Sequence, residues 1–396
     1  MTTRAGRGGR GDATRRIPRG AFPRACAVAV LLAASAAQVA AQGALSTLGF
    51  GYPSGGLSSR SLATGGALGE LDPQSPLNPA SIVLSSRAQA YFQYDPEFRS
   101  VNAGAGTVST TTERFPVFMI TGTQGRATFA LSYASFMDRT WSNSYADTQS
   151  VGGERIASTV FTSSEGGIAD ARAAMAWTVN ERLHFGVGVH LYPGQDRVSI
   201  GRAFADTQHI GSFSLSNTYT FSGTGVSFGG VWISPNHLVL AADLRAGGSL
   251  SMLQGDSTEV GSGRVPLRFG VSASYDGITG AVLSARFARD RWSDLRGLGS
   301  QTLGLQDANE VSAGAEVAGP RLGGGVVTFR AGFQTRGLPF TYEGSAVGET
   351  SFAGGLGIPV AGNRGFIDVG LSRASRSAQT VSEHAWVLSI GAGIRP

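Results

Sequence analysis

The sequence predicts an all-β protein, a 14-stranded antiparallel transmembrane β-barrel with an N-terminal plug in its lumen. Three observations predict this class. Apolar and polar residues alternate with period two in fourteen segments, the connections between the segments are short and long in turn, and the charges keep to one face. The expected organisation is a signal peptide at residues 1–41, a plug or hatch at 42–84 and the barrel at 85–396.

The first 41 residues have the features of a cleaved export signal. A basic region with seven arginines precedes the 13-residue apolar run Ala25–Ala37, and Val39-Ala40-Ala41 fits the small-x-small pattern of a cleavage site. The run is too short to cross about 30 Å of hydrocarbon, so a membrane helix is not expected. A buried helix of a soluble protein is the alternative.

Removal of this leader changes what the composition implies. The leader carries seven arginines and Asp12, a net charge of +6, whereas the whole chain is +5, so the mature chain is −1. A nucleic-acid partner is therefore not expected. The only cysteine, Cys26, lies in the leader, which leaves no thiol for a disulfide or a metal in the mature chain.

The predicted strands are defined by alternation, as in Leu183–Tyr192, where apolar residues share one face and His184 and His190 share the other. The other thirteen are Arg87–Tyr94, Val117–Gly122, Ala127–Ser135, Ile168–Val179, Thr218–Ile233, Leu238–Ala246, Pro266–Tyr275, Thr279–Phe287, Glu310–Val317, Val326–Gln334, Thr350–Ile358, Phe366–Ser372 and Trp386–Arg395. No other segment reaches 18 consecutive apolar residues, so a helical membrane protein is excluded.

The connections and the charges distinguish a membrane barrel from a soluble sandwich. Six short turns interleave with seven long connections, which is the pattern of periplasmic turns and extracellular loops. The long connections include residues 335–349 and 373–385. Polar residues expected to face the lumen are Asp170, Arg172, His184, His190, Asp243, Arg245, Arg268, Arg286, Glu310, Glu316, Arg330 and Asp368. Trp177, Trp232 and Tyr275 lie on the apolar face beside short turns, as in an interfacial aromatic girdle.

A glycine- and proline-rich stretch, LATGGALGELDPQSPLNPAS at residues 62–81, precedes the first strand. Both ends of an even-stranded barrel lie on the periplasmic side, and irregular backbone at membrane depth needs polar partners that a lumen supplies. A fourteen-strand lumen is too wide for its own side chains to fill, and inward glycines such as Gly186 and Gly188 are expected to widen it. The stretch is therefore expected to fill the lumen; a disordered periplasmic tail is the alternative.

The same stretch resembles the hatch of FadL-type outer-membrane transporters and their PorV-like relatives. Asn78, Pro79 and Ala80 match the Asn-Pro-Ala motif of that family, and Gly65, Gly66 and Gly69 match its glycine-rich part. Segments near the C-terminus, such as ETSFAGGLGIP, resemble the family's last hairpins. The chain departs from the family at Ile394-Arg395-Pro396, where an aromatic residue is usually presented to the barrel-assembly machinery.

The resemblance implies an outer-membrane channel of a Gram-negative-type bacterium for passive uptake of hydrophobic or amphipathic small molecules, of long-chain fatty-acid-like kind, gated by the hatch. Its expected partners are outer-membrane lipid, the hydrophobic substrate and the assembly machinery. The family also implies release of the substrate through the wall. The alternative is a PorV-like scaffold or shuttle barrel for exported proteins.

Enzymatic and metal chemistry is not expected from the sequence. Gly225–Gly229 fits the G-x-S-x-G pattern, but it lies within alternating strand, and a nucleophile elbow needs a strand-to-helix turn that exposes the serine beside a histidine. Ser227 is therefore predicted to be a small lumen-facing residue. His184 and His190 are about 20 Å apart along a strand, too far to share an ion. No cofactor is predicted.

Overall fold

The computed structural model describes residues 50–395, apart from 86–87, 103–106, 152, 206–210, 256, 299–303, 323–324, 363 and 380. All of them belong to one unit, Ala40–Pro396. The predicted signal peptide lies outside the described residues, and so do residues 42–49 of the predicted hatch.

The described strands form one antiparallel sheet. They are β1 (Tyr52–Pro53), β2 (Gln89–Asn102), β3 (Thr107–Arg114), β4 (Val117–Gln124), β5 (Ala127–Asp138), β6 (Trp141–Val151), β7 (Glu154–Asn180), β8 (Leu183–Leu191), β9 (Gly194–Phe204), β10 (Phe213–Ile233), β11 (Leu238–Gln254), β12 (Thr258–Arg264), β13 (Arg268–Ile278), β14 (Ala281–Asp290), β15 (Ala308–Leu322), β16 (Gly325–Tyr342), β17 (Ser345–Val360), β18 (Gly365–Ala378) and β19 (Val381–Ile394).

Helical segments are short: α2 (Ser59–Ala63), η1 (Pro79–Leu84) and η2 (Trp292–Leu298). Among the described residues, no helix has the length and apolar character needed to cross a membrane.

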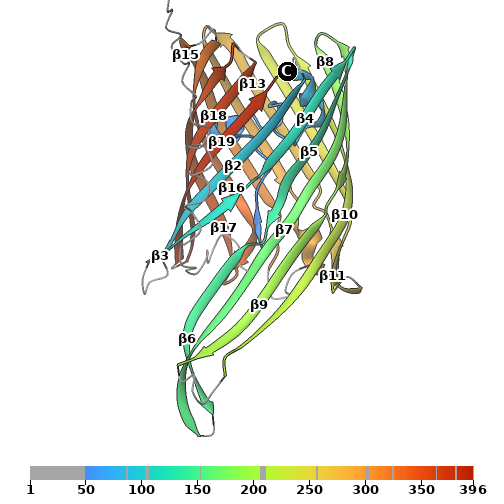
Figure 1. Cartoon of the computed structure of the whole chain (residues 1–396). Helices are drawn as coiled ribbons and strands as arrows, with labels where there is room; N and C mark the ends of the chain where they lie inside the picture. Colours follow the sequence, from blue (N-terminus) through green and yellow to red (C-terminus); the bar gives the residue numbers. More distant parts are fainter. Residues whose placement is uncertain are drawn as a thin grey trace, which may run out of the picture. The chain divides into compact units, whose positions relative to one another are not determined.

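Fourteen of the strands close a ring, in the order β2, β4, β5, β7, β8, β10, β11, β13, β14, β15, β16, β17, β18 and β19. The last strand returns to the first through pairs that include Trp386↔Phe98 and Ile394↔Ala90. The predicted 14-stranded antiparallel barrel is thus confirmed (Figure 1). Closure gives every wall strand two partners, so the wall has no free edge in contact with lipid.

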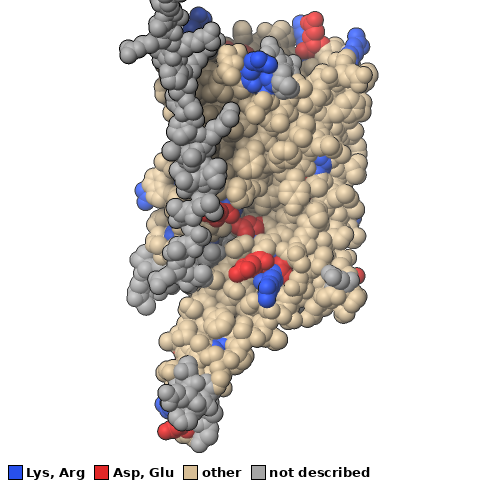
Figure 2. All heavy atoms as spheres, viewed as in Figure 1, with Lys and Arg blue, Asp and Glu red and all other residues tan. Residues whose placement is uncertain are grey.

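The two faces of the wall differ in polarity, as the alternation predicts. On β8, Val187 and Val189 are 50% and 58% exposed, whereas His184 and His190 are 7% and 1% exposed. Figure 2 shows a broad, mostly uncharged outer band, with charged side chains gathered toward its two ends. Trp177, Trp232 and Tyr275 are exposed on the outer face, each near a short turn. An apolar outer band is the surface that hydrocarbon requires.

The long connections are strand extensions more than loops, which corrects their prediction. β16 and β17 continue to a tight turn at Glu343 and Gly344, with Arg336 paired to Glu349, where a loop at 335–349 was predicted. β18 and β19 likewise continue through the predicted loop at 373–385. Beyond the apolar band both faces carry polar side chains, such as the exposed Arg373 and the buried Arg376 of β18, but backbone pairing continues because each extension has a partner strand.

Four extensions project furthest from the barrel. We call β6, the first part of β7 (154–165), β9 and the first part of β10 (213–220) the projecting sheet, which extends beyond the barrel in Figure 1. Leu215 and Ile200 pair directly and share one face, where they are 60% and 48% exposed. Apolar side chains therefore lie open on this sheet.

The half of the lumen nearer the projecting sheet contains a buried apolar cluster. Phe136 lies at its centre, with ring centroids 5.1 Å from Tyr192 and 5.5 Å from Trp292 of η2. Leu338 and Phe340 of β16 belong to the same cluster. Packed side chains fill much of this half of the lumen.

Candidate functional site: the lumen and the N-terminal segment

Residues 50–85, which we call the N-terminal segment, run inside the ring of strands (Figure 1). Most of these residues are buried. Helix α2 contacts β16 to β19, and η1 contacts β5, β7, β8 and β10, so the segment touches wall on two sides.

Helix α2 begins at a serine cap and ends at two glycines. The Ser58 hydroxyl accepts a hydrogen bond from the Ser61 amide, a common helix start. Gly65 and Gly66 have φ angles of +65° and +84°. A Cβ on Gly65 would lie 2.5 Å from the Phe333 amide nitrogen, so only glycine allows this turn against β16.

Asn78-Pro79-Ala80 forms the start of η1. Asn78 is extended, its side-chain oxygen accepts from the Ala80 amide at 2.8 Å, and Pro79 occupies the first turn. The Asn78 side-chain amide donates to the Glu70 carbonyl at 3.0 Å and to the Gly230 carbonyl of β10 at 3.3 Å. One side chain therefore holds the helix start, the loop before it and the wall together.

Inward-facing glycines receive the segment rather than widening an open lumen, which corrects their expected effect. A Cβ on Gly186 would collide with Pro79 and Ala80, one on Gly314 or Gly332 with Thr64, one on Gly270 with Glu70, and one on Gly391 with Ser59. The missing side chains leave recesses that the segment fills, as close packing requires. Gly69 packs against Arg286 in the same way.

The Glu70 carboxylate makes what we call the Glu70 anchor. It accepts from Arg268 of β13 and Arg286 of β14, both at 2.7 Å, and from the Ser272 hydroxyl at 2.6 Å. The Glu70 side chain is fully buried. Burial acts to raise the pKa of Glu70, but Arg286, Arg268 and Ser272 outweigh it, so the pKa lies below its ordinary value.

Asp243 of β11 lies beside this anchor without a hydrogen-bonding partner. Neither of its carboxylate oxygens makes a hydrogen bond, and the nearer one is 3.7 Å from Arg268 Nε. A Cβ on Gly270 would come close to both the Glu70 and the Asp243 carboxylates. Three acids thus approach Arg268, namely Glu70 at 2.7 Å, Asp290 at 3.2 Å and Asp243 at 3.7 Å.

A second charged contact joins α2 to β15. Arg60 Nε donates to Glu316 at 2.9 Å, and Glu316 also accepts from Arg330 at 2.7 Å. Arg330 reaches Asp368 in turn. Asp72 lies near Arg60, and burial raises the pKa of Asp72 above its ordinary value even though Arg60 and the Ser58 hydroxyl oppose this.

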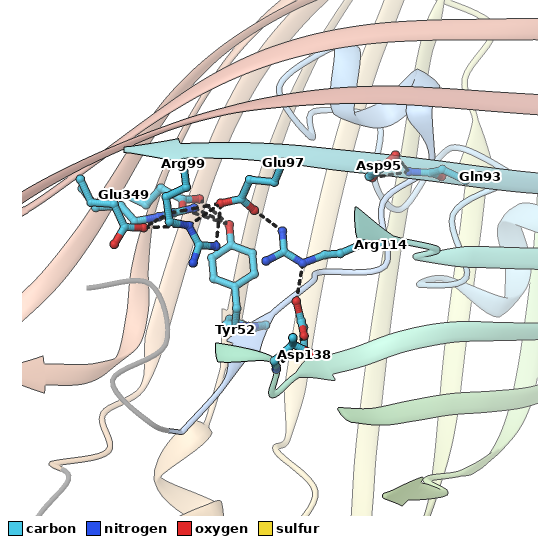
Figure 3. A network of polar contacts seen from close by, with 12 residues as sticks. Tyr52, Gln93, Asp95, Glu97, Arg99, Arg114, Asp138 and Glu349 are labelled. Carbon is cyan, nitrogen blue, oxygen red and sulfur yellow. Dashed lines mark hydrogen bonds and ion pairs between the residues drawn. The ribbon is translucent and has the colours of Figure 1, made fainter. Parts of the chain in front are cut away.

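The Tyr52 anchor joins the other end of the segment to the wall (Figure 3). The Tyr52 hydroxyl contacts the Glu349 carboxylate at 3.0 Å and accepts from Arg336 and Arg376. Three guanidinium groups lie 4.9 to 5.0 Å from the centre of its ring, those of Arg114, Arg336 and Arg376. These arginines also pair with wall carboxylates, namely Asp138, Glu97, Glu349 and Glu383.

The twelve polar residues expected on the inner face are all sheltered from solvent. Ten are less than 10% exposed: Asp170, Arg172, His184, His190, Asp243, Arg245, Arg268, Arg286, Glu316 and Asp368. The side chains of Arg330 and Glu310 are 7% and 13% exposed. Arg268 and Arg286 are brought to Glu70, whereas His184, near a short turn, makes its hydrogen bond with Thr178, at 3.2 Å.

One group of hydrogen-bonded side chains was not predicted from the sequence. Ser227 lies on the inner face of β10, as predicted, but its Oγ is 2.8 Å from His190 Nε2, and His190 Nδ1 is 2.7 Å from the Asp170 carboxylate. The prediction that Ser227 is a small lumen-facing residue did not include this histidine contact. Register explains the contact, because same-face residues on β7, β8 and β10 are diagonal neighbours. No metal-binding group of acids and histidines occurs in the described part of the chain.

Cavities of different size lie beside the segment. A cavity of about 60 Å³ lies between the segment and the apolar cluster, and its lining includes Leu77, Phe136, Asp170, Trp292 and Arg336. A larger cleft of about 560 Å³ lies at the wall between the ends of β3 and β5. Two cavities of about 250 Å³ each lie between the segment and the wall, one lined by Leu68 and Ile233 and the other by Gln74 and Glu316.

Solved structures share this architecture. A Pseudomonas aeruginosa FadL homologue superposes with a TM-score of 0.61 and 13% identity, covering 87% of this chain and 99% of that one. The Ralstonia pickettii toluene transporter TbuX gives 0.56 and 16%, covering 86% and 98%. The CymD monoaromatic hydrocarbon channel gives 0.54 and 14%, covering 86% and 98%. No protein-family model and no curated protein matches the sequence. The chain has the fold of the FadL-type outer-membrane transporters.

Proposed function

We propose that the chain is an outer-membrane channel for passive uptake of hydrophobic or amphipathic small molecules, of long-chain fatty-acid-like kind, and that residues 42–84 are its hatch. The observation that carries the proposal is the Glu70 anchor, where a segment whose strand pairing to the wall is the two residues of β1 is held in the lumen mainly by side-chain contacts. Ion pairs and hydrogen bonds can exchange without unfolding the wall. The fold and the apolar cluster are consistent with such a channel.

Asp243 lowers the free-energy cost of moving the hatch. If Glu70 moved away alone, Arg268 and Arg286 would lose a buried carboxylate, and such a loss costs about 3–5 kcal/mol. Asp243 already lies 3.7 Å from Arg268 and makes no hydrogen bond, so it can move into the vacated position. In this proposal the two carboxylates exchange at Arg268 when the hatch opens.

The route begins outside the membrane and ends within the wall. Exposed apolar side chains on the projecting sheet collect the substrate, and the apolar cluster accepts it when the hatch moves. β4 begins at Val117, whereas β5 continues to Asp138, so beside the end of β5 the wall relies on β1 and on the ion pair between Arg114 and Asp138. We propose this place for lateral release.

Export and membrane insertion complete the proposal. Residues 1–41 are proposed to be cleaved on export, after which the assembly machinery inserts the barrel into the outer membrane with its apolar band in lipid. Single cysteines in the thiol-free mature chain test the orientation with a membrane-impermeant reagent on intact cells. Labelling is expected at Trp141 and not at Asn180; the opposite result would reverse the orientation.

A disulfide across the hatch tests gating. The hydroxyl oxygens of Ser59 in α2 and Ser389 in β19 are 2.7 Å apart, so S59C with S389C places two thiols within bonding reach. Uptake of a fluorescent long-chain fatty acid into proteoliposomes should stop in the oxidised double variant and return after reduction. The two single-cysteine variants control for the substitutions.

The outcomes separate the two parts of the proposal. Uptake that continues in the oxidised variant would show that this segment is not the gate. No uptake by the unmodified chain, for fatty acids and for aromatic hydrocarbons alike, would reject the channel itself. Heat-modifiable mobility in gels confirms that each variant is folded.

The projecting sheet favours a second candidate, a scaffold for exported proteins. In the part of the chain that the structure describes, β6 has its register pairs with β7, and its other edge offers backbone groups of the kind to which partner strands add. Removal of residues 143–163 should abolish cross-linking to exported proteins if this role exists. If that variant retains uptake and its cross-linking is unchanged, the scaffold role is rejected and the channel is the candidate that remains.

A further inference from the structure

Ser227, His190 and Asp170 form a hydrogen-bonded chain on the inner wall with the connectivity of a nucleophile, a base and an orienting acid. The distances are 2.8 Å from Ser227 Oγ to His190 Nε2 and 2.7 Å from His190 Nδ1 to Asp170 Oδ1. All three side chains come from wall strands, β10, β8 and β7, whose pairing fixes their spacing. Catalytic triads are recognised by this geometry and not by the order of residues in the chain.

The hydrogen bonds assign the proton positions. An ionised Asp170 can only accept, so His190 Nδ1 carries the hydrogen and Nε2 of the neutral ring is an acceptor. The Ser227 hydroxyl then donates to Nε2, as removal of its proton by a general base requires. Tyr192 stacks on the His190 ring at 6.0 Å between centroids and limits its rotation.

Arg172 supplies donors beside the serine. Its Nε and Nη2 are buried and have no hydrogen-bonding partner. A Cβ placed on Gly188 would lie 2.6 Å from Ser227 Oγ and 3.3 Å from Arg172 Cδ, so glycine lets the two side chains approach each other. An unpaired buried guanidinium is costly, and negative charge developing on an acyl oxygen at Ser227 would satisfy it.

We propose that this chain is a catalytic site that hydrolyses carboxylic esters with an apolar acyl group. Ser227 Oγ attacks the ester carbon while its proton passes to His190 Nε2. The ester C–O bond breaks and the leaving alkoxide takes that proton from His190. Water then attacks the acyl-serine, gives a proton to His190 and releases the acid, and that proton returns to Ser227. Arg172 stabilises the oxyanion in both steps.

The N-terminal segment controls access to this site. Ser227 is 1% exposed, and Asn78 and Pro79 pack onto Gly229 and Gly186 beside it. Arg172 also lies within 3.5 Å of the Leu77 carbonyl. Phe136 and Trp292 lie beyond Tyr192 and give the acyl chain an apolar environment. The inference does not require net uptake, only movement of the segment.

An alkyl fluorophosphonate, which forms a bond to activated serines, tests the site on the folded mature chain in mild detergent. Mass spectrometry of the digested protein should find the adduct on Ser227. The adduct should disappear in S227A, and its rate of formation should fall by a factor on the order of 10² or more in H190N. The oxidised S59C and S389C pair should block it until reduction.

S284A is the matched control, because Ser284 is also a buried inward serine but donates to the Gly314 carbonyl of the wall. It should leave the Ser227 adduct unchanged. Absence of the adduct both in the unmodified chain and in E70Q, whose hatch is loosened, would overturn the proposal. So would labelling of H190N at the unmodified rate, or hydrolysis of a medium-chain p-nitrophenyl ester that is equal in S227A and the unmodified chain.

Discussion

The Tyr52 anchor and the Glu70 anchor attach the same segment to the same wall by opposite means. At Tyr52 a neutral hydroxyl is inserted into a set of charges that belong to the wall. At Glu70 the segment supplies a full negative charge to Arg268 and Arg286. The first anchor carries no charge of its own, whereas separation of the second removes from Arg268 and Arg286 a carboxylate that they share, which leaves them with Asp290 and Glu310.

The wall residues around the two anchors differ in how their charges are paired. Around Tyr52, the arginines are already paired with wall carboxylates such as Glu349 and Glu97. Around Glu70, the wall keeps Asp243 without a hydrogen bond while the segment is present. The comparison teaches that the charged anchor determines whether the segment stays, and that the neutral anchor mainly fixes its position.

Charge reversal at Glu70 should have the largest effect. In E70K a cation meets Arg268 and Arg286, and loss of the buried pairs costs about 3–5 kcal/mol. The alkylation rate of a cysteine at the buried position Ser59 measures opening in the thiol-free mature chain, and it should rise on the order of 10²-fold or more. The wall should remain folded because Asp243 replaces Glu70. An unchanged rate would mean that Glu70 does not hold the segment.

Removal of the replacement acid should have a smaller effect in the opposite direction. D243N removes the carboxylate that would take the place of Glu70, so opening leaves Arg268 with Asp290 alone, and the alkylation rate should fall about tenfold. D290N serves as the control, because Asp290 pairs with Arg268 at 3.2 Å whether or not the segment is present. Equal effects of D243N and D290N would argue against exchange.

Mild acid should distinguish the two acids of the segment by the direction of their pKa shifts. The pKa of Glu70 is lowered in the folded state, so its stabilisation is present above its ordinary pKa and is lost only as pH falls through the lowered value. The pKa of Asp72 is raised, so it takes up a proton first, and this uptake favours the folded state. The Ser59 cysteine should therefore react no faster at pH 5 than at pH 7, after correction for thiolate content. Faster reaction at pH 5 would contradict this prediction.

Loss of the Tyr52 hydroxyl should have the smallest effect. Y52F removes hydrogen bonds with Arg336, Arg376 and Glu349 but keeps the ring beneath the guanidinium groups, and the cost should be about 1 kcal/mol. The alkylation rate should rise less than tenfold. A larger rise than in E70K would reverse the ranking of the two anchors.

The wall strands were predictable from the sequence because the alternation of apolar and polar residues can be seen within each strand. On β8, each residue reveals its face by its polarity, since lipid on one side requires it. Glu70 and Asp72 are the only acids in residues 62–81, and that fact could have suggested charged contacts. Their partners could not be predicted, because they depend on where an irregular segment settles against distant strands.

The strand extensions and the contact between Ser227 and His190 were not predicted, for a related reason. Arg336, Glu349 and Arg376 were assigned to loops, since outside the bilayer nothing forces apolar residues onto one face. The contact between Ser227 and His190 needs the register of β8 against β10, which no single strand contains. The segment at 192–212 between those strands hides that register from the sequence.

The length of β7 has a mechanical consequence. Its 27 residues form one continuous ladder through the wall and the projecting sheet, although about 9–11 residues suffice to cross a bilayer. The part before Ile168 is a lever arm of roughly 45 Å at about 3.3 Å per residue. Asp170 lies two residues after Ile168, where this arm joins the wall. A tilt of a few degrees at the wall therefore sweeps the tip through several ångströms, and a load on the tip is returned to the wall as torque.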